Sequence, residues 1–316
     1  MDMVEEKEIT VNIKKYDGKN DPYWKTYKVR ADRYTQMTEV LRRIKTEQDP
    51  ALAYRASCHM AVCGSCAMKI NGFPRLACRT MAFDVMDENN EINLEAMDYY
   101  KGIRDLIPDI DTFYDRMYKV MPRLYADESV IAGENEQRMT PSEQKEVWKF
   151  QECIWCGLCV SACPSVRMDE KFLGPAAHAK GYRFIADGRD TKTEERINIL
   201  MDSAWRCTSC YMCYEVCPQD VQPVIAIKKT KSYLNEYKGN TEVTEMARKH
   251  DDTVFDLINN TGKIKESTLY LKTFGFGEAI KDINYMRKEG KLKYALAKDN
   301  DVKNIDEIKK IMGDKK

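Results

Sequence analysis

Twelve cysteines in three tight groups constrain this chain more than any other feature of its sequence. In a small secreted domain, so many cysteines would predict a disulfide framework. Here the chain has 316 residues, and most neighbouring cysteines within a group are separated by only two to four residues. Such spacings bring several thiols into one loop, which suits metal ligation better than disulfide bonds. The pattern predicts metal centres in a reducing, cytoplasmic environment.

The first cysteine run has the spacing of a plant-type two-iron ferredoxin, C-x4-C-x2-C with a distant fourth cysteine. Its members are Cys58, Cys63, Cys66 and Cys78. We expect three of them to wrap a [2Fe–2S] cluster from one loop and the fourth to return from a strand. Gly64 would let the backbone approach the inorganic sulfides closely. A four-cysteine zinc site is the alternative, but zinc prefers paired C-x2-C knuckles, which this stretch lacks.

The second and third cysteine runs both match C-x2-C-x2-C-x3-C-P, the run of bacterial ferredoxins with two [4Fe–4S] clusters. In those proteins the fourth cysteine of each run ligates the cluster of the other run. This crossing predicts one cubane held by Cys153, Cys156, Cys159 and Cys217. It predicts a second cubane held by Cys207, Cys210, Cys213 and Cys163. Zinc is again the alternative, although three cysteines at successive x2 gaps followed by C-P do not form a zinc pattern.

No residue of the sequence is predicted to be catalytic. The three sites use all twelve cysteines, so no thiol is left for nucleophilic chemistry or for a disulfide. No Gly-x-Gly-x-x-Gly follows a strand and no P-loop occurs, so no flavin or nucleotide site is predicted. An electron carrier without its own two-electron cofactor needs partners at both ends. We therefore expect a subunit of an enzyme complex; a non-redox metal-binding scaffold is the alternative.

A few other residues have two interpretations. His59 follows a predicted ligand, so a Rieske-like role competes with a supporting or exposed position; the complete four-cysteine set favours the latter. His178 and His250 are interpreted as structural. Trp155 and Tyr211 stand between predicted ligands, where they would shield a cluster, line an electron path, or simply pack.

The N-terminal part predicts a small α+β domain, residues 1–105. Alternating apolar and polar residues predict strands, and a helical period predicts one helix, with Thr38 as its N-cap. The expected elements are strands at 8–17, 24–29, 67–70, 76–80 and 91–94 and a helix at 38–46.

The remainder of the chain predicts helices. Thr140 and Pro141 indicate a helix start, and further helices are expected at 176–186, 193–205, 244–259, 277–287 and 305–312. We expect an α-helical ferredoxin domain over 106–235, with both cubanes, and a helical C-terminal extension over 236–316.

Composition limits the possible partners. The formal net charge is zero, from 51 basic and 51 acidic residues, so no basic field predicts binding to nucleic acid. No run of eighteen apolar residues predicts a membrane span. The polar, acidic N-terminus predicts no Sec or twin-arginine signal. The C-terminal basic residues would touch a membrane surface or, more simply, form a solvated end: Lys309, Lys310, Lys315 and Lys316.

The order of the three runs resembles the iron–sulfur subunit of succinate dehydrogenase and fumarate reductase, respiratory complex II. The resemblance covers roughly residues 8–232. It rests on S-C-H-M-A-V-C-G-S-C-A-M-K-I-N-G-F-P-R-L-A-C from Ser57, I-R-D-L-I-P-D-I from Ile103, G-P-A-A from Gly174 and Y-R-F-I-A-D-G-R-D from Tyr182. It implies a β-grasp ferredoxin domain followed by an α-helical ferredoxin domain. It also implies a path from a flavoprotein subunit containing FAD, through the clusters, to quinone.

The sequence departs from the common family pattern at five positions. His59 and Ala61 stand where the family has Arg and Gly. At the position of Cys210 the family has no cysteine, and its third centre is a three-iron cluster. Because Cys210 completes the run here, we expect a second [4Fe–4S] cluster, with a lower reduction potential. If Cys210 is not a ligand, this centre would be isolated as [3Fe–4S]. Thr208 and Met168 replace the family's His and Trp, so the familiar quinone pocket is not reproduced.

These departures resemble a non-classical branch of the family, whose membrane-associated anchor subunit has cysteine-rich domains similar to heterodisulfide reductase. The stretches T-G-K-I-K-E-S-T-L-Y-L-K-T-F-G from Thr261 and R-K-E-G-K-L from Arg287 are similar to heterodisulfide reductase ferredoxin subunits. The resemblance implies that the C-terminal extension docks this anchor. It implies a peripheral location on the cytoplasmic side of the cell membrane, with partner subunits holding the chain there.

Together these observations predict the electron-transfer subunit of a succinate:quinone oxidoreductase. Single electrons would pass from a flavoprotein that oxidises succinate to fumarate, through three clusters, to a quinone-reducing subunit, so contact with quinone is indirect. The alternatives are a quinol- or thiol-linked fumarate reductase and another flavin dehydrogenase, such as a glycerol-phosphate or glycolate enzyme.

Overall fold

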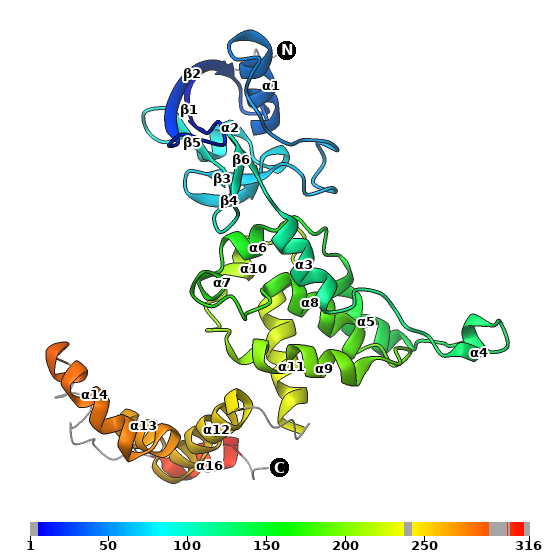
Figure 1. Cartoon of the computed structure of the whole chain (residues 1–316), viewed down its shortest axis with the longest axis vertical. Coiled ribbons are helices and arrows are strands. Elements are labelled where there is room, and N and C mark those ends of the chain that lie inside the picture. The colour runs from blue at the N-terminus through cyan, green and yellow to red at the C-terminus, as the bar shows by residue number, and fades with distance from the viewer. Residues whose placement is uncertain (1–5, 237–241, 291–301, 303, 313–316) are drawn as a thin grey trace. The chain divides into compact units, whose positions relative to one another are not determined.

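The computed structural model of the chain describes residues 6–236, 242–290, 302 and 304–312 (Figure 1). It divides into two compact units, Met1–Leu234 and Asn235–Lys316, which are described one at a time. The first unit contains all three cysteine runs.

A mixed five-stranded sheet forms the N-terminal part of the first unit, in the order β2-β1-β5-β3-β4. Strands β1 and β2 form an antiparallel hairpin, whereas β1 and β5 run parallel. Side chains that alternate along β1 are buried, as the sequence pattern predicts, and the apolar face of helix α1 is buried as well. The strands are β1 (Lys7–Lys15), β2 (Tyr23–Ala31), β3 (Ala67–Ile70), β4 (Phe73–Leu76) and β5 (Glu91–Glu95), and the helix is α1 (Met37–Glu47).

Two local predictions in this part are wrong. Thr38 does not cap α1: the cap position is Gln36, whose side chain makes no capping bond, and Thr38 is buried inside the first turn. A bridge between Gln36 and Met81 fixes where the helix begins. The strand expected at 76–80 ends at Leu76, because the chain then turns into the 3-10 helix η1 (Ala77–Arg79).

The I-R-D-L stretch contains a buried carboxylate, Asp105, whose structural role the sequence did not indicate. Asp105 lies between β6 (Gly102–Arg104) and β7 (Ile107–Pro108), where it is buried. Its carboxylate accepts hydrogen bonds from Lys15 Nζ at 2.8 Å and from the Ala53 amide at 2.8 Å. Lys15 also pairs with Asp49 at 3.1 Å. The charged group is thus compensated inside the domain, and it joins β1 to the segment that leads into the first cysteine run.

The rest of the first unit is helical. Pro141 begins α5, and Thr140 and Glu143 form a capping box there, as the sequence predicts. A small apolar core lies between α5, α8 and α11 and contains Phe150, Ala179 and Tyr182. The helices are α3 (Asp111–Lys119), α4 (Glu128–Ile131), α5 (Pro141–Gln151), α6 (Leu158–Ser161), α7 (Pro164–Met168), α8 (Pro175–Ile185), α9 (Thr193–Trp205), α10 (Met212–Glu215) and α11 (Pro223–Glu236), with a short helix α2 (Ala82–Val85) in the sheet domain.

The Y-R-F-I-A-D-G-R-D stretch at the end of α8 is a charged anchor for the helices. Asp187 is buried and pairs with Arg183 at 2.6 Å and Arg189 at 2.8 Å. Asp190 pairs with the fully buried Arg196, whose guanidinium also donates to the carbonyls of residues 120, 121 and 123 behind α3. The stretch therefore fixes α3, α8 and α9 around the cysteine runs.

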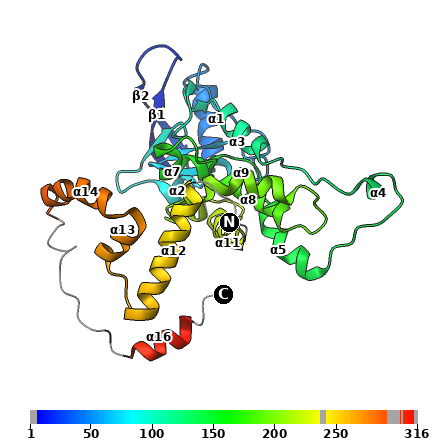
Figure 2. The same ribbon diagram turned by 60° about the horizontal axis from the view of Figure 1, so that its bottom comes forward.

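The described part of the second unit contains helices α12 (Glu242–Thr261), α13 (Glu266–Phe274), α14 (Phe276–Lys288) and α16 (Ile305–Met312) (Figure 2). Helix α12 packs against both α13 and α16. Helix α13 was not predicted. It ends at Gly275 after only nine residues, which is too short for a clear helical pattern of apolar residues. Among the described helices, none has the length and apolarity that crossing a bilayer requires. The side chains of Lys309, Lys315 and Lys316 lie outside the described residues.

Candidate metal centres

The first cysteine run forms what we call the two-iron site: Cys58, Cys63, Cys66 and Cys78. Backbone amides in its loop donate to sulfur. The amides of Val62 and Cys63 reach Cys58 Sγ at 3.3 Å, and the Ala61 amide reaches Cys78 Sγ at 3.2 Å. The Cys78 amide reaches Cys66 Sγ at 3.5 Å. Amide donors favour the charged form of a thiolate and stabilise a negatively charged group.

The loop of the two-iron site has an unusual backbone. His59, Ala61 and Gly64 have φ values of 54°, 59° and 72°. Residues of this conformation, placed between residues with negative φ, turn successive amides inward and form an anion-binding nest. The left-handed region costs a residue with a Cβ roughly 1–2 kcal/mol, which explains why the family pattern has glycine where this chain has Ala61. The His59 side chain is exposed.

Hydrogen bonding and burial differ sharply between thiols of the two-iron site. Ser65 Oγ lies 2.8 Å from Cys63 Sγ, and this contact is the main reason that the pKa of Cys63 falls to about 6. Burial raises the pKa of Cys66 to about 12. One side of the site is therefore exposed and polar, and the opposite side is buried.

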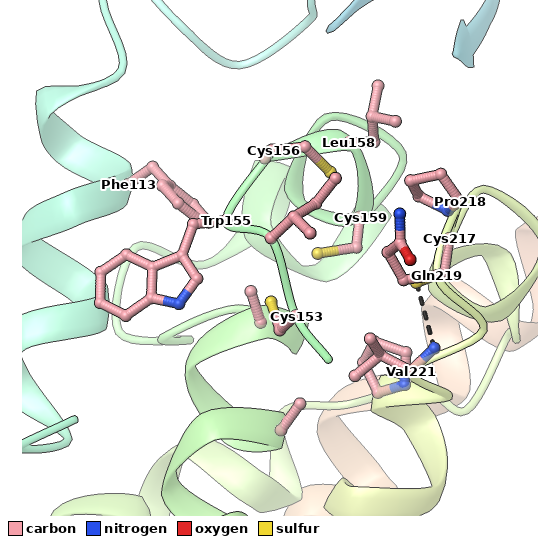
Figure 3. A pocket seen from close by; sticks show the side chains of 15 residues that line it. Phe113, Cys153, Trp155, Cys156, Leu158, Cys159, Cys217, Pro218, Gln219 and Val221 are labelled. Carbon is pink, nitrogen blue, oxygen red and sulfur yellow. Dashed lines mark hydrogen bonds between the residues drawn. The ribbon is translucent and has the colours of Figure 1, made fainter. Parts of the chain in front are cut away.

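The second run and one cysteine of the third surround a common pocket, which we call the first cubane site: Cys153, Cys156, Cys159 and Cys217. Figure 3 shows these thiols among apolar side chains that include Phe113 and Leu158. The Val221 amide donates to Cys217 Sγ at 3.3 Å. Burial raises the pKa of Cys156 to about 12. The structure thus brings together the four cysteines of the predicted crossed set.

The remaining cysteines gather at the second cubane site: Cys163, Cys207, Cys210 and Cys213. Burial raises the pKa of Cys213 to about 12, and the negative charges of Cys207, Cys163 and Cys210 add to this shift. The Ser209 amide donates to Cys207 Sγ at 3.4 Å. Cys210 is exposed, whereas Cys213 is buried. Cys163 therefore lies with the third run, although which cysteines act as ligands stays a prediction.

Both cubane sites share a backbone that sequence reasoning missed. Trp155 and Gly157 have φ values of 57° and 78°, and Ser209 and Tyr211 have 54° and 64° at the equivalent positions of the third run. Only one of these four residues is glycine, so the other three adopt a conformation that their Cβ atoms disfavour. A repeated nest of this kind suits an anionic group in each site.

These donor sets fit iron–sulfur clusters. Each site offers four thiols, amides aimed at sulfur, and a loop that turns its N–H groups inward. Within the part of the chain that the structure describes, no three His, Cys, Asp or Glu side chains are arranged to hold a single metal ion.

The two-iron site and the first cubane site are in direct contact. A Cβ atom placed on Gly64 would lie only 2.7 Å from the Cβ of Cys156. Tyr100 Oη donates to the Gly157 carbonyl at 3.1 Å, and Gln219 Nε2 donates to the Ala61 carbonyl at 2.7 Å. Sequence reasoning assigned Gly64 to sulfide approach only. Its second role, as the point where two domains meet, had no local signal.

Two lysines beside the cubane sites were also missed. Lys180 Nζ lies 5.9 Å from the centroid of the Trp155 ring. Burial raises the pKa of Cys153, and the positive charge of Lys180 opposes that shift. Lys228 Nζ donates to Tyr211 Oη at 2.5 Å. Each lysine comes from a helix distant in sequence from the aromatic residue that it contacts, so spacing alone does not reveal it.

Comparisons with known proteins agree with this arrangement. A family described as the 2Fe-2S iron-sulfur cluster binding domain matches residues 10–115, and the 4Fe-4S dicluster domain family matches residues 149–221. The fumarate reductase iron-sulfur subunit of Haemophilus influenzae is 33% identical over 237 residues, which cover 71% of this chain and 91% of that protein. The succinate dehydrogenase iron-sulfur subunit of Coxiella burnetii is 35% identical over 233 residues, covering 72% and 97%.

A solved structure shows the same fold. A chain of the Mycobacterium smegmatis Sdh1 complex in the apo form superposes with a TM-score of 0.68 at 24% identity, covering 74% of this chain and 98% of that chain. The predicted α+β fold with two ferredoxin-type domains is confirmed, as is the presence of [2Fe–2S] and [4Fe–4S] chemistry. A third cluster stays a prediction.

Proposed function

Because the chain belongs to the family of iron–sulfur subunits of succinate dehydrogenase and fumarate reductase, we propose that it relays single electrons from a flavoprotein subunit to a membrane-associated, quinone-reducing subunit. As a member of this family, it is one subunit of an oxidoreductase complex. The two-iron site holds a [2Fe–2S] cluster, and each cubane site holds a [4Fe–4S] cluster. The clusters supply one-electron chemistry, which neither the side chains nor the backbone can provide.

The observation that carries this proposal is the contact between Gly64 and Cys156. It places a loop of the two-iron site against a loop of the first cubane site without an intervening side chain. The hydrogen bond of Tyr100 ties the sheet domain to the Gly157 loop, and that of Gln219 ties the segment after Cys217 to the two-iron loop. The protein's part in the relay is to fix this separation, to bury the thiols and to direct amides toward sulfur.

The exposed side of the two-iron site supports docking of the flavoprotein. Met60 and Val62 project from the loop with 70% and 60% of their surfaces exposed. Large apolar side chains on a ligand loop suit a surface that a partner covers. A flavoprotein bound there would have its cofactor next to the thiols that the loop carries.

A second exposed region of the first unit, at the second cubane site, supports docking of the anchor. Cys210 is exposed in the second cubane site, and Met168, after Cys163 on α7, is 82% exposed. Met168 and Thr208 occupy the places where the family has its quinone-pocket residues. An acceptor subunit, rather than a quinone bound to this chain, is therefore proposed as the next electron carrier.

Helices α12 to α16 are proposed to hold the anchor. Phe276, Ile280 and Ile283 lie four and three residues apart on α14 and are exposed, so they form an apolar stripe along one helix face. Truncation after about residue 235 should release the anchor and retain the flavoprotein in a pull-down of the native complex. Retained anchor would contradict this assignment.

Fumarate reduction is the second candidate, because relatives named for it are as similar to this chain as those named for succinate dehydrogenase. Purification of the native complex through a tag on this chain tests both. We expect about ten irons and ten sulfides per chain and both activities in the purified complex, with their ratio deciding the favoured direction. Zinc without sulfide would overturn the relay. An oxidised three-iron signal in an intact preparation would exclude Cys210 as a ligand.

A further inference from the structure

Lys180 lies beside the first cubane site. It lies on α8, one residue after Ala179 and four after Ala176, and both alanines line the pocket of the four cysteines. The side chain is partly buried, and its Nζ lies 5.9 Å from the centroid of the Trp155 ring. Trp155 stands between Cys153 and Cys156. The ammonium group is therefore held beside the loop that surrounds the pocket.

Among the residues that the structure describes, no carboxylate pairs with this ammonium group. Across the described ranges of the chain, Lys180 forms no ion pair and its Nζ donates no hydrogen bond. Other lysines of the first unit with restricted exposure differ: Lys15 has Asp49 and Asp105, and Lys69 has Glu95 and Asp98. A partly buried charge without a partner is unfavourable, unless a negative group occupies the neighbouring space.

We propose that Lys180 is the counter-charge of the first cubane site and raises the reduction potential of the cluster held there. This inference rests on the proposed [4Fe–4S] cluster of that site and goes beyond it, because it assigns a potential-setting role to a residue that is not a ligand. A fixed positive charge stabilises the reduced cluster more than the oxidised one, since reduction adds one negative charge.

The second cubane site also has lysines beside it: the partly buried Lys231 donates to the Cys207 carbonyl at 3.4 Å. Lys228 contacts Tyr211, but Tyr211 is exposed, and so is Cys210. Solvent and salt screen an exposed charge more than a buried one. The charge of Lys180 acts on the cubane that adjoins the two-iron site, whereas Lys228 and Lys231 act on the other.

The test is an anaerobic redox titration of the purified complex, followed by electron paramagnetic resonance. Lys180→Met removes the charge and keeps the length of the side chain; Lys180→Arg keeps the charge. Lys145→Met, at an exposed position on α5, is the matched control. We expect K180M to lower the equilibrium constant for reducing one cubane about tenfold, or about 59 mV. That cubane should be the one whose reduction broadens the two-iron signal. K180R should restore the wild-type value.

Several outcomes would overturn the inference. A K180M titration that matches K145M would show that the charge is irrelevant, and an equal shift in K180R would attribute the effect to packing. If K180M loses the cubane and K180R keeps it, the charge is still required; loss in both variants contradicts its role. Wild-type complex that contains no cubane signal would instead overturn the proposed function itself, so the two failures are distinguishable.

Discussion

The two cubane sites share one backbone conformation and differ in nearly everything around it. In the first, Cys159 is buried and the pocket is walled by apolar side chains from α3, α6 and α8. In the second, Cys210 is exposed and adjoins the exposed Tyr211. The same motif thus produces an enclosed site next to the two-iron site and a second site that is partly open to solvent. Solvent exposure is among the factors that set cluster potentials and stability. The enclosed site therefore suits transfer between clusters inside the chain, and the exposed site suits transfer to a partner subunit.

The largest expected effect comes from removing one cysteine at each site. Cys159→Ser should abolish the first cubane, because a buried site cannot replace the lost thiolate with water. Cys210→Ser should remove from the second cubane only the iron that Cys210 would bind, which leaves a three-iron cluster. Iron analysis should show a loss of about four irons per chain in C159S and about one in C210S. Equal losses would remove the distinction between the two sites.

The second-largest effect is expected from disturbing the contact between the two-iron site and the first cubane site. Gly64→Ala combines a left-handed φ with a Cβ that would approach Cys156 to 2.7 Å. We expect the loops to move apart and electron transfer from the two-iron cluster to slow severalfold in freeze-quench measurements. Gly72→Ala is a matched control, because Gly72 has a φ of 77° and no heavy atom within 4 Å of its Cβ position. If both variants behave alike, strain alone accounts for the effect.

Acid stability tests the enclosed character of α8. His178 is fully buried on this helix, and burial lowers its pKa to about 3. The folded protein keeps the imidazole neutral, whereas the unfolded chain takes up a proton below about pH 6.5. Stability should therefore be unaffected above pH 6.5 and fall by about 2 kcal/mol from pH 6.5 to pH 5.

The measurement is the urea midpoint of the full chain at both pH values. His178→Gln should lose this pH dependence, while His250→Gln, at a half-buried position on α12, should keep it. A wild-type midpoint that does not change with pH would show that His178 is accessible to protons in the folded state.

The smallest effect is expected at the two-iron site. Ser65→Ala removes the hydroxyl 2.8 Å from Cys63 Sγ. Loss of one hydrogen bond to sulfur should lower the midpoint potential of this cluster by the equivalent of about 1 kcal/mol. Ser57→Ala, an exposed serine in the same loop, is the control. An unchanged potential in S65A would mean that the hydroxyl bonds elsewhere once the cluster is bound.

Sequence reasoning succeeded where chemistry depends on spacing along the chain. The three cysteine runs, the capping box at Thr140 and the helix at 193–205 all follow from local patterns. It failed where packing over long distances decides. The bridge between Gln36 and Met81 displaced the expected cap at Thr38.

The lysines beside the cubane sites and the second role of Gly64 illustrate the same limit. Lys180 is 25 residues from Trp155 in the sequence, and Cys156 lies in a different domain from Gly64. Neither of these contacts produces a periodicity or a motif in the sequence. The left-handed backbone of Trp155 and Tyr211 was equally hidden, because these residue types rarely adopt it and so carry no sequence signal for it.

The pairing of Cys217 with the second run also sets an order of biosynthesis. All cysteines of the two-iron site have been translated by residue 78, so this site can be loaded on a nascent chain. The pocket around Cys153, Cys156 and Cys159 is not complete until residue 217 has left the ribosome. Neither proposed cubane has its full set of cysteines before residue 213 has been translated. A chain that ends between residues 78 and 213 would carry every cysteine of the two-iron site and a complete set for neither proposed cubane.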